Sequence, residues 1–310
     1  MNNLHIALNE LTNASRVLKQ TASLNKFGVA KHIYIAGLHS DGLKYDEEVS
    51  QDISLKRFSL STRKLSKLFF IQALKYLEYC WQVAFFYRGK NIKLVSVHSL
   101  SLLPLGLLLK KLYKAKLVYD THELETETNG LQGFRKRVSK FFEKSLIKHV
   151  DMTLVVSESI ADWYADEYKI KRPTVVLNAP NYRELKANNH FREQLGIRAN
   201  QVILLYQGGL ALGRGVHLIL EAFKIRSDDR MVVVFMGYGQ LEAEIKSAAE
   251  QHNNIYFYPA VPPQVVLEYT SSADVGISII ENTCLSYYYC MPNKLFEYAM
   301  TGLPVLVSNM

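Results

Sequence analysis

Two side chains near the carboxyl end of the sequence could together bind a nucleotide. Pro292 and Gly302 bound an apolar run in which a helix should begin at about Asn293. Lys294 and Glu297 are three residues apart, so they should share one face of its first turns. A helix amino end with a lysine attracts phosphate, and a carboxylate one turn later can accept both ribose hydroxyls. Taken alone, the spacing also fits an exposed ion pair.

A glycine-rich loop with one arginine precedes another predicted helix and could hold phosphate groups. It follows a strand-like run, and its glycines are Gly208, Gly209, Gly213 and Gly215. Glycines let backbone N–H groups approach phosphate oxygens, and the Arg214 guanidinium can contact two oxygens at once. The spacing fits neither the Walker pattern nor the dinucleotide-binding pattern, so by itself it indicates phosphate only weakly.

Polar residues also follow strand-like runs in the first half of the chain. His122 comes after the run 116–119, and Asp120 and Glu123 beside it could orient its ring or bind acceptor hydroxyls. His98, just past the run 93–97, is a weaker candidate. A lone histidine in a strand-to-helix turn is more often structural than functional, so these residues alone leave both interpretations open.

Strand-like and helix-like runs alternate along the chain and would position these side chains. In the first half we expect strands at 4–8, 31–36, 93–97, 116–119, 152–156 and 174–177, and helices at 15–27, 64–87, 103–113, 133–148 and 160–168. In the second half we expect strands at 202–206, 231–236, 255–258, 275–280 and 304–307, and helices at 216–223, 241–252, 263–271 and 293–300. Continuous Val, Ile and Leu strands between amphipathic helices predict α/β domains with parallel sheets covered on both faces.

A polar connection at 178–200 predicts two domains, 1–177 and 178–310. Two doubly wound domains in tandem would place a ligand cleft between them, at the carboxyl ends of the strands. Asn13 and Arg16, in the first strand-to-helix loop, would then lie where acceptors bind in such folds. The chain stops three residues after a predicted strand, so we expect a truncated product or fragment whose second domain is incomplete.

The positive charge of the chain is concentrated in one region. The whole chain carries a formal net charge of +8, yet residues 56–116 alone contain thirteen Lys or Arg against one acid, Glu78. Such asymmetry suggests an anionic partner, either nucleic acid or an anionic membrane, although a solvated basic face would look the same. Aromatic residues interleave with these cations, as in an interfacial element, so we predict a membrane surface rather than nucleic acid.

Other features favour a cytoplasmic protein attached peripherally to the inner face of a bacterial plasma membrane. Three unpatterned cysteines suggest neither disulfides nor a zinc site, which fits a reducing compartment. No signal peptide is predicted, and the apolar stretch 69–87 is interrupted by Lys75 and Glu78, so no transmembrane helix is expected either.

The order of these motifs resembles family 4 of the retaining glycosyltransferases, which have the two-domain GT-B fold. There, a loop like 207–216 holds the donor diphosphate and a helix like 293–300 holds the nucleotide. Residues 236–239, with Gly237, and 258–263 are similar to strand ends that flank the base, and 273–278 to a further strand. Residues 118–124, 155–159 and 176–180 resemble landmarks of the acceptor domain, where His122 matches a histidine near the reacting sugar.

Two departures from the family pattern bear on the donor site. The family often has a glutamate eight residues before the position of Glu297, and this chain has Tyr289. The usual arginine after the first loop glycine is Gly209 here, which leaves Arg214 and Lys294 to neutralise a diphosphate. The sequence contains no D-x-D pair, so we expect neither a metal nor another cofactor.

The resemblance implies a retaining transfer of a sugar from a UDP- or GDP-linked donor to a lipid-linked or saccharide acceptor in cell-surface polysaccharide synthesis. His122, Arg214 and Lys294 would be the catalytic residues. Two rivals are a GT-B sugar-nucleotide epimerase and a non-catalytic or truncated binding protein of the same fold. Tyr289 and the early end of the chain somewhat favour the interpretation as a non-catalytic protein.

Overall fold

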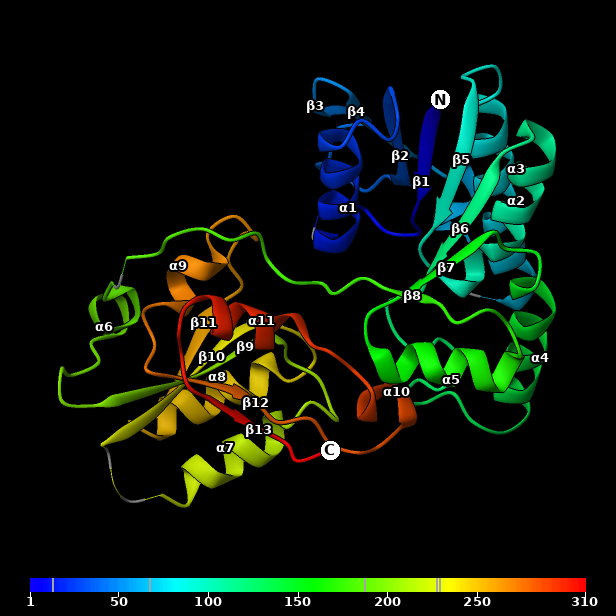
Figure 1. The fold of residues 1–310 in the computed structure, drawn as a ribbon. Helices are drawn as coiled ribbons and strands as arrows, with labels where there is room; N and C mark the ends of the chain where they lie inside the picture. The colour runs from blue at the N-terminus through cyan, green and yellow to red at the C-terminus, as the bar shows by residue number, and fades with distance from the viewer. Residues whose placement is uncertain (13, 67, 187, 227, 229) are drawn as a thin grey trace. The chain divides into compact units, whose positions relative to one another are not determined.

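The computed structural model describes residues 1–12, 14–66, 68–186, 188–226, 228 and 230–310. The chain divides into two compact units (Figure 1). The first comprises Met1–Thr126 and Leu131–Val176, and the second comprises Glu127–Gly130 and Leu177–Met310. Each unit is built on one sheet whose strands are mostly or entirely parallel.

An eight-stranded sheet forms the centre of the first unit, in the order β3-β4-β2-β1-β5-β6-β7-β8. Its strands are β1 (Asn2–Ile6), β2 (His32–Leu38), β3 (Asp46–Ser50), β4 (Ile53–Phe58), β5 (Ile92–Val97), β6 (Lys116–Asp120), β7 (Met152–Val155) and β8 (Thr174–Val175). Neighbours pair in parallel except β3 and β4, which are antiparallel. The strand order reverses between β1 and β5, which makes this the point where a doubly wound sheet offers a crevice.

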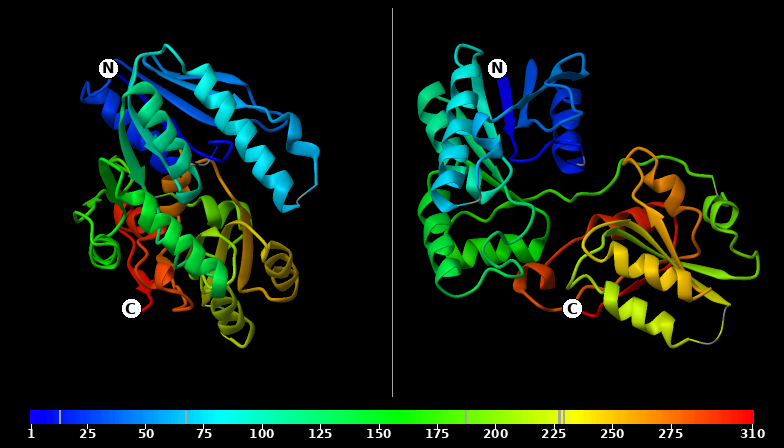
Figure 2. Two further views of the ribbon diagram at one scale, coloured as in Figure 1. Left: turned by 90° about the vertical axis from the view of Figure 1, so that its right-hand side faces the viewer. Right: turned by 180° about the vertical axis from the view of Figure 1, so that it is seen from behind.

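Helices cover both faces of this sheet. They are α1 (Ser15–Lys26), α2 (Phe69–Phe86), α3 (Leu103–Tyr113), α4 (Gly133–Ile147) and α5 (Glu158–Tyr168), with short 3-10 turns η1 (Ser61–Lys64) and η2 (Leu100–Leu102). Helix α1 lies on one face, whereas α2, α3 and α4 lie on the other (Figures 1 and 2). Crossover connections between parallel strands are right-handed. The chain adds strands toward one edge of the sheet before α2 and toward the other edge after it, so the connecting helices lie on opposite faces.

The second unit has a five-stranded parallel sheet in the order β11-β10-β9-β12-β13. Its strands are β9 (Val202–Gly209), β10 (Met231–Tyr238), β11 (Ile255–Pro259), β12 (Val275–Ser278) and β13 (Val305–Val307). Its helices are α6 (His190–Leu195), α7 (Val216–Lys224), α8 (Glu242–Gln251), α9 (Val266–Thr270), α10 (Leu285–Tyr288) and α11 (Asn293–Met300). Alternate residues of β10 face opposite ways: Val233 and Phe235 join the core under α7 and α8, and Val234 joins the core under α11.

The prediction of two doubly wound α/β domains is confirmed, but several elements differ from the sequence-based expectation. The segment expected to be a polar loop before residue 64 contains β3 and β4, where Ile53 and Leu55 alternate into the core. Helix α2 begins at Phe69 rather than at residue 64, since the Glu78 carboxylate accepts the backbone N–H groups of Ser61 and Thr62 and holds them in a separate turn. The short helices α6 and α10 were also not predicted.

A buried carboxylate joins α4 and α5 to the sheet of the first unit. The Tyr119 and Tyr164 hydroxyls donate to Oε1 of Glu143 at 2.7 and 2.8 Å, and the Tyr168 hydroxyl donates to Oε2 at 2.8 Å. Burial raises the pKa of Glu143, although the three tyrosine hydrogen bonds oppose the shift. The side chain therefore couples three elements through hydrogen bonds that replace water.

A single tyrosine ties α11 to the sheet of the second unit. The Tyr298 hydroxyl donates toward the carbonyl oxygens of Leu205 and Ile277 at 2.9 and 3.2 Å, and the N–H of Gln207 donates to it at 3.1 Å. Its ring packs over Gly276, where an added Cβ would lie 2.4 Å from the ring. This contact fixes the start of α11 relative to the end of β9.

In the part of the chain that the structure describes, no helix is long and apolar enough to span a bilayer.

The end of β9 depends on a close approach between two backbones. A Cβ added at Gly237 would lie 1.9 Å from the carbonyl oxygen of Gly208, whereas one added at Gly209 would meet no heavy atom within 4 Å. We expect Gly237→Ala to lower the free energy of unfolding by about 1–3 kcal/mol, because backbone atoms must move apart. Gly209→Ala is the matched control and should be close to neutral. Urea unfolding of both variants checks this, and equal stabilities would contradict it.

Candidate functional site

The phosphate-binding candidates of the second unit gather where its strand order reverses. Strand β9 lies between β10 and β12, and its last residues, Gln207–Gly209, form the carboxyl edge of the sheet there. The loop after β9 runs into α7 at Val216. Ligands of doubly wound domains bind at this edge and at this switch of order.

The glycines of the loop have different roles. Gly208, Gly213 and Gly215 have φ angles of +117°, +78° and +72°, which favour glycine. A Cβ at Gly215 would lie 2.3 Å from the carbonyl oxygen of Ile279, so this position also needs glycine for packing. Around Gly208 and Gly209, in contrast, the space is open and the backbone is exposed. An anion can therefore reach the start of the loop.

Gly237 and Glu281 contact this loop from neighbouring elements. Gly237, on the neighbouring strand β10, is buried and pairs with Gly208, so its close backbone approach supports the start of the loop. The Gly215 N–H donates to the Glu281 carboxylate at 3.2 Å, and the Glu281 N–H donates to the Gly213 carbonyl at 3.1 Å. Glu281 was missed by the sequence analysis, because nothing in its surroundings marks it as a loop partner. An acid here neutralises the far end of the loop and leaves the Gly208 end for a ligand.

Arg214 and Lys294 lie close enough to influence one another. The Arg214 guanidinium lies 5.0 Å from the centre of the Tyr287 ring, and the Lys294 ammonium lies 3.5 Å from the centre of the Tyr206 ring. Both contacts are of the cation–π type. Neither aromatic residue was predicted from the sequence, since aromatic residues are as common in cores as at binding sites.

Lys294 is a buried cation without a hydrogen-bond partner. Its exposed fraction is 6%, and its Nζ has no hydrogen bond within the described residues. Burial, followed by repulsion from Arg214, lowers the pKa of Lys294 to about 7. The alternative of an exposed ion pair is excluded, because the lysine is not exposed. A buried ammonium at the amino end of α11 is a site that an anion would complete.

Glu297 is held by a partner that the sequence analysis overlooked. The Gln207 Nε2 donates to Oε2 of Glu297 at 2.5 Å, and the Gln207 Oε1 accepts from the Thr270 hydroxyl at 2.8 Å. Gln207 stands directly before Gly208 at the strand end, and this position was the available signal. Asn293, the first residue of α11, is exposed, and its Oδ1 accepts from the Asn178 amide at 2.7 Å.

In the first unit, Asp120 occupies the centre of a second polar cluster. It ends β6, next to β5 at the reversal of strand order, and it is fully buried. The Arg16 guanidinium donates to both of its oxygens, at 2.6 Å from Nη2 and at 2.9 and 3.1 Å from Nε, and Gln20 donates at 2.8 Å. Burial by itself raises the pKa of Asp120, but the hydrogen bonds from His122, His98 and Arg16 lower it well below its usual range.

A chain of buried hydrogen bonds runs from Asn3 to this carboxylate. Asn3 Nδ2 lies 3.0 Å from His5 Nε2, His5 Nδ1 lies 2.9 Å from His98 Nε2, and His98 Nδ1 lies 3.1 Å from Asp120 Oδ2. Burial lowers the pKa of both His5 and His98, so both rings are neutral at physiological pH. A neutral ring has one donor and one acceptor nitrogen, and an ionised carboxylate only accepts. Each histidine must therefore carry its proton on Nδ1.

His122 lies beside the same carboxylate, and its contacts bear on which ring nitrogen carries the proton. Its Nε2 lies 3.3 Å from Asp120 Oδ2, and its side chain is 39% exposed. The same Nε2 lies 3.3 Å from His98 Nδ1, which donates to Asp120. With its proton on Nε2, a neutral His122 donates to Asp120 and keeps Nδ1 as its acceptor nitrogen. The ligand atoms of His98, Asp120 and His122 lie within 4.8 Å of one another, close enough for a metal ion. The Arg16 guanidinium also donates to this carboxylate.

The structure brings together Arg16, His98, Asp120 and His122, four of the six acceptor-side residues predicted from the sequence. Glu123 is partly exposed, and its carbonyl oxygen accepts from the Thr121 hydroxyl. Asn13 lies outside the described residues. His5 and Gln20 were missed, because they stand inside a strand and on a helix, where polar residues give no pattern.

Comparison with protein families matches nearly the whole chain. The model of Glycosyltransferase Family 4 matches residues 21–180, and that of Glycosyl transferases group 1 matches residues 187–310. WcaI of Escherichia coli (strain K12), named as a colanic acid biosynthesis glycosyl transferase, is 26% identical over 170 residues, which cover 49% of this chain and 41% of WcaI. The match thus spans less than half of that relative.

Several solved structures share the fold. Sucrose-phosphate synthase from Thermosynechococcus elongatus aligns with a TM-score of 0.76 at 14% identity, over 99% of this chain and 81% of that one. HepE of Anabaena, solved in complex with UDP-glucose, aligns with a TM-score of 0.70 at 14% identity, over 99% and 80%. At these identities the likeness establishes the two-domain GT-B fold.

The buried Lys294 leads to a pH-dependent prediction for the ligand-free protein. Lys294→Met should raise the free energy of unfolding, because it removes a buried cation and keeps most of its volume. The pKa of Lys294 is about 7 in the folded protein and near 10.5 when exposed. The cost of burying the charge is therefore complete below pH 7 and disappears toward pH 10.5. At about 1.4 kcal/mol per pKa unit it is on the order of a few kcal/mol.

Urea unfolding at several pH values between 6.5 and 10 tests this prediction. The advantage of Lys294→Met over the parent should shrink steadily as the pH rises through this range. Lys246→Met, on the exposed side of α8, is the matched control and should show no comparable gain. A pH-independent difference at Lys294 would mean that the lysine stays protonated in the folded chain.

Proposed function

The chain belongs to glycosyltransferase family 4, and on this premise we propose that it transfers a sugar from a nucleoside-diphosphate donor to a lipid-linked or saccharide acceptor in cell-surface polysaccharide synthesis. The observation that carries the proposal is the buried ammonium of Lys294, which has no hydrogen-bond partner among the described residues, in the same unit as an open glycine loop. The relationship to WcaI, named for a polysaccharide pathway, supports the class of product.

The donor diphosphate would bind between the start of the Gly208–Gly215 loop and the amino end of α11. Exposed N–H groups near Gly208, the Arg214 guanidinium and the Lys294 ammonium would share its charge. As the bond to the sugar breaks, negative charge grows on the departing diphosphate, and fixed cations stabilise it most at that stage. We propose that these protein cations do this without a metal. Glu297, oriented by Gln207, would accept the ribose hydroxyls.

His122 would position the reacting sugars from the first unit. Its Nδ1 can accept a hydrogen bond from a sugar hydroxyl, while Asp120 holds Nε2 and the orientation of the ring. Retention of the anomeric configuration is what family membership implies. The base of the donor is left as uridine or guanosine, and the structure of HepE with UDP-glucose supports the uridine alternative.

A membrane-bound acceptor is supported by an outer helical face on the first unit. Helices α2, α3 and α4 lie on the same side of the sheet (Figure 2). The face consists of their exposed apolar side chains: Phe69, Phe70, Leu74, Leu77, Trp81, Phe85, Leu108, Leu112, Phe134, Val138, Phe141 and Phe142. On α2 they recur every three or four residues and form one stripe. Basic residues surround them, among them Lys111, Arg135, Arg137 and Lys144. We propose that this face rests on the anionic inner leaflet of the bacterial plasma membrane.

Incubation with radiolabelled nucleotide sugars and membrane extract tests the proposed activity. Transfer of label to an acceptor is expected, whereas isomerised donor would indicate an epimerase and binding alone a non-catalytic protein. Arg214→Ala and Lys294→Ala should each weaken binding of UDP or GDP by about 1.5–3 kcal/mol, the range for charge-assisted hydrogen bonds. Unchanged nucleotide affinity in both variants would overturn the donor site.

His122→Ala separates the roles of the two units. It should lower the transfer rate strongly and leave nucleotide affinity unchanged, because the residue belongs to the other unit. The exposed His149, on the same unit, supplies the control His149→Ala, which should retain full transfer. An equal loss of nucleotide binding in His122→Ala would identify His122 as a residue needed for folding.

Liposome flotation tests the membrane proposal. Binding should require anionic lipid and fall at high salt, since each Lys or Arg near an anionic leaflet contributes roughly 1 kcal/mol. Reversing Arg135 and Arg137 to Glu should abolish flotation. Reversing two other exposed cations, Lys26 at the end of α1 and Lys31 directly before β2, should not. Equal flotation with neutral lipid, or none with either lipid, would favour a soluble acceptor.

A further inference from the structure

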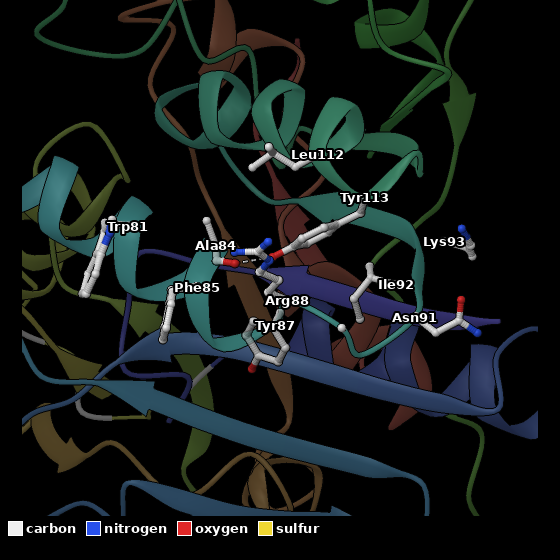
Figure 3. Close-up of a pocket in the computed structure, with 11 residues that line it drawn as sticks. Trp81, Ala84, Phe85, Tyr87, Arg88, Asn91, Ile92, Lys93, Leu112 and Tyr113 are labelled. Carbon is white, nitrogen blue, oxygen red and sulfur yellow. Dashed lines mark hydrogen bonds between the residues drawn. The ribbon is translucent and has the colours of Figure 1, made fainter.

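A groove lies between the last turns of α2 and α3, next to the start of β5. It encloses about 700 Å³ and is lined by aromatic, aliphatic and basic side chains (Figure 3). Small-molecule sites in proteins typically measure about 300–1,000 Å³, so the groove is large enough for part of a ligand of that class. No role assigned above to the donor site or the histidine cluster uses it.

One wall of the groove is apolar and open to solvent. Trp81 and Phe85 stack on successive turns of α2, with ring centres 5.5 Å apart and planes 11° apart. They are 66% and 64% exposed, and Leu112 on α3 is 58% exposed. Side chains of this size gain stability from burial, so a contiguous exposed set marks a surface that another apolar group covers.

The rest of the groove is cationic. Arg88 and Lys93 line it, and no acidic residue does. Figure 3 places Arg88 in the middle of the groove beside Tyr113, whose hydroxyl donates to the carbonyl oxygen of Ala84 at 2.6 Å. Burial raises the pKa of Tyr113 to about 12, and the nearby Arg88 charge opposes that shift. Within the described residues no carboxylate pairs with the Arg88 guanidinium, which therefore remains available to an anion.

We propose that this groove binds one molecule of an anionic membrane phospholipid, with its phosphate on Arg88 and part of an acyl chain along Trp81, Phe85 and Leu112. The charge of the lining selects a negative headgroup, and the aromatic wall selects a hydrocarbon chain. The inference rests on the proposed membrane docking and gives it a specific site. The stripe of the outer helical face leads into the groove, because Trp81 and Phe85 belong to both.

The position of the groove keeps this lipid away from the sugar chemistry. The groove adjoins Ile92, where β5 begins, whereas His98 follows the other end of β5. Six residues of strand span about 20 Å, so a lipid held here cannot have its phosphate at the histidine cluster. The bound molecule would therefore anchor and orient the first unit and would not be the sugar acceptor.

Titration with a short-chain lipid below its micelle concentration tests the site without a bilayer. Trp163→Phe leaves Trp81 as the sole tryptophan, whose fluorescence should change saturably with dihexanoyl phosphatidylglycerol and hardly at all with dihexanoyl phosphatidylcholine. Arg88→Gln should weaken binding about tenfold or more, as expected for a lost charge-assisted hydrogen bond. Ala84→Leu, which fills the groove without changing its charge, should weaken it as well.

Lys26→Gln is the matched control, since Lys26 is exposed at the end of α1 and belongs neither to the groove nor to the outer helical face, and it should bind like the parent. Arg88 is exposed, so its replacement should leave the fold intact, which circular dichroism verifies. Equal responses to the two lipids, or unchanged binding in Arg88→Gln and Ala84→Leu, would overturn the proposal. Self-association through this face, with no response to lipid, would identify a second copy of the chain as the occupant.

These readouts are independent of sugar transfer. If the lipid binds and no transfer occurs, the proposed enzyme activity fails and the lipid site stands. If transfer occurs and neither lipid binds, the lipid site fails and the activity stands.

Discussion

Burying a charge in a protein is unfavourable unless other groups compensate it, and this requirement organises both candidate sites. Asp120 in the first unit is fully buried and surrounded by donors from Arg16, Gln20, His98 and His122. Lys294 in the second unit is almost as deeply buried and has no hydrogen-bond partner within the described chain. The Asp120 charge is compensated by hydrogen bonds from the protein, whereas the Lys294 charge would be compensated by the proposed ligand.

This difference gives the two sites different physical characters. The compensated carboxylate makes the first site a rigid one, since its donors come from helix α1, from the residue after β5 and from the turn after β6. The hydrogen bonds among them also determine the proton positions of His5 and His98. Such a site restrains the orientation of His122. The ammonium of Lys294, which has no hydrogen-bond partner among the described residues, makes the second site electrostatically incomplete, and the proposed diphosphate would compensate it.

The outer helical face of the first unit shows the same relation between exposure and function for apolar groups. Helix α2 buries only Tyr79 and Val83 fully, while its stripe of Phe, Leu and Trp side chains is exposed. Amphipathic helices of a globular domain normally turn such a stripe inward. Here Tyr79 and Val83 are the residues of α2 that enter the core, and the aromatic residues of the opposite face stay exposed. The groove at the end of this stripe adds the cations Arg88 and Lys93 to it, which is why the proposed partner is an anionic lipid.

The α/β class, the two domains and most of the parallel strands could be predicted from the amino-acid sequence, because buried parallel strands and their covering helices have distinct periodicities that do not depend on distant contacts. The sequence also proposed Arg214, Lys294 and His122 as site residues, because they lie in or shortly after the segments that follow strands of such sheets. It could not identify His5, Gln207 or Glu281, whose roles arise from partners tens of residues away in the chain. It also could not show that Lys294 is buried without a hydrogen-bond partner among the described residues, or that Phe, Leu and Trp side chains of α2 are exposed. These properties depend on burial, and burial depends on how the elements pack. Which face of a helix contacts the sheet and which contacts solvent is therefore known only from the tertiary structure.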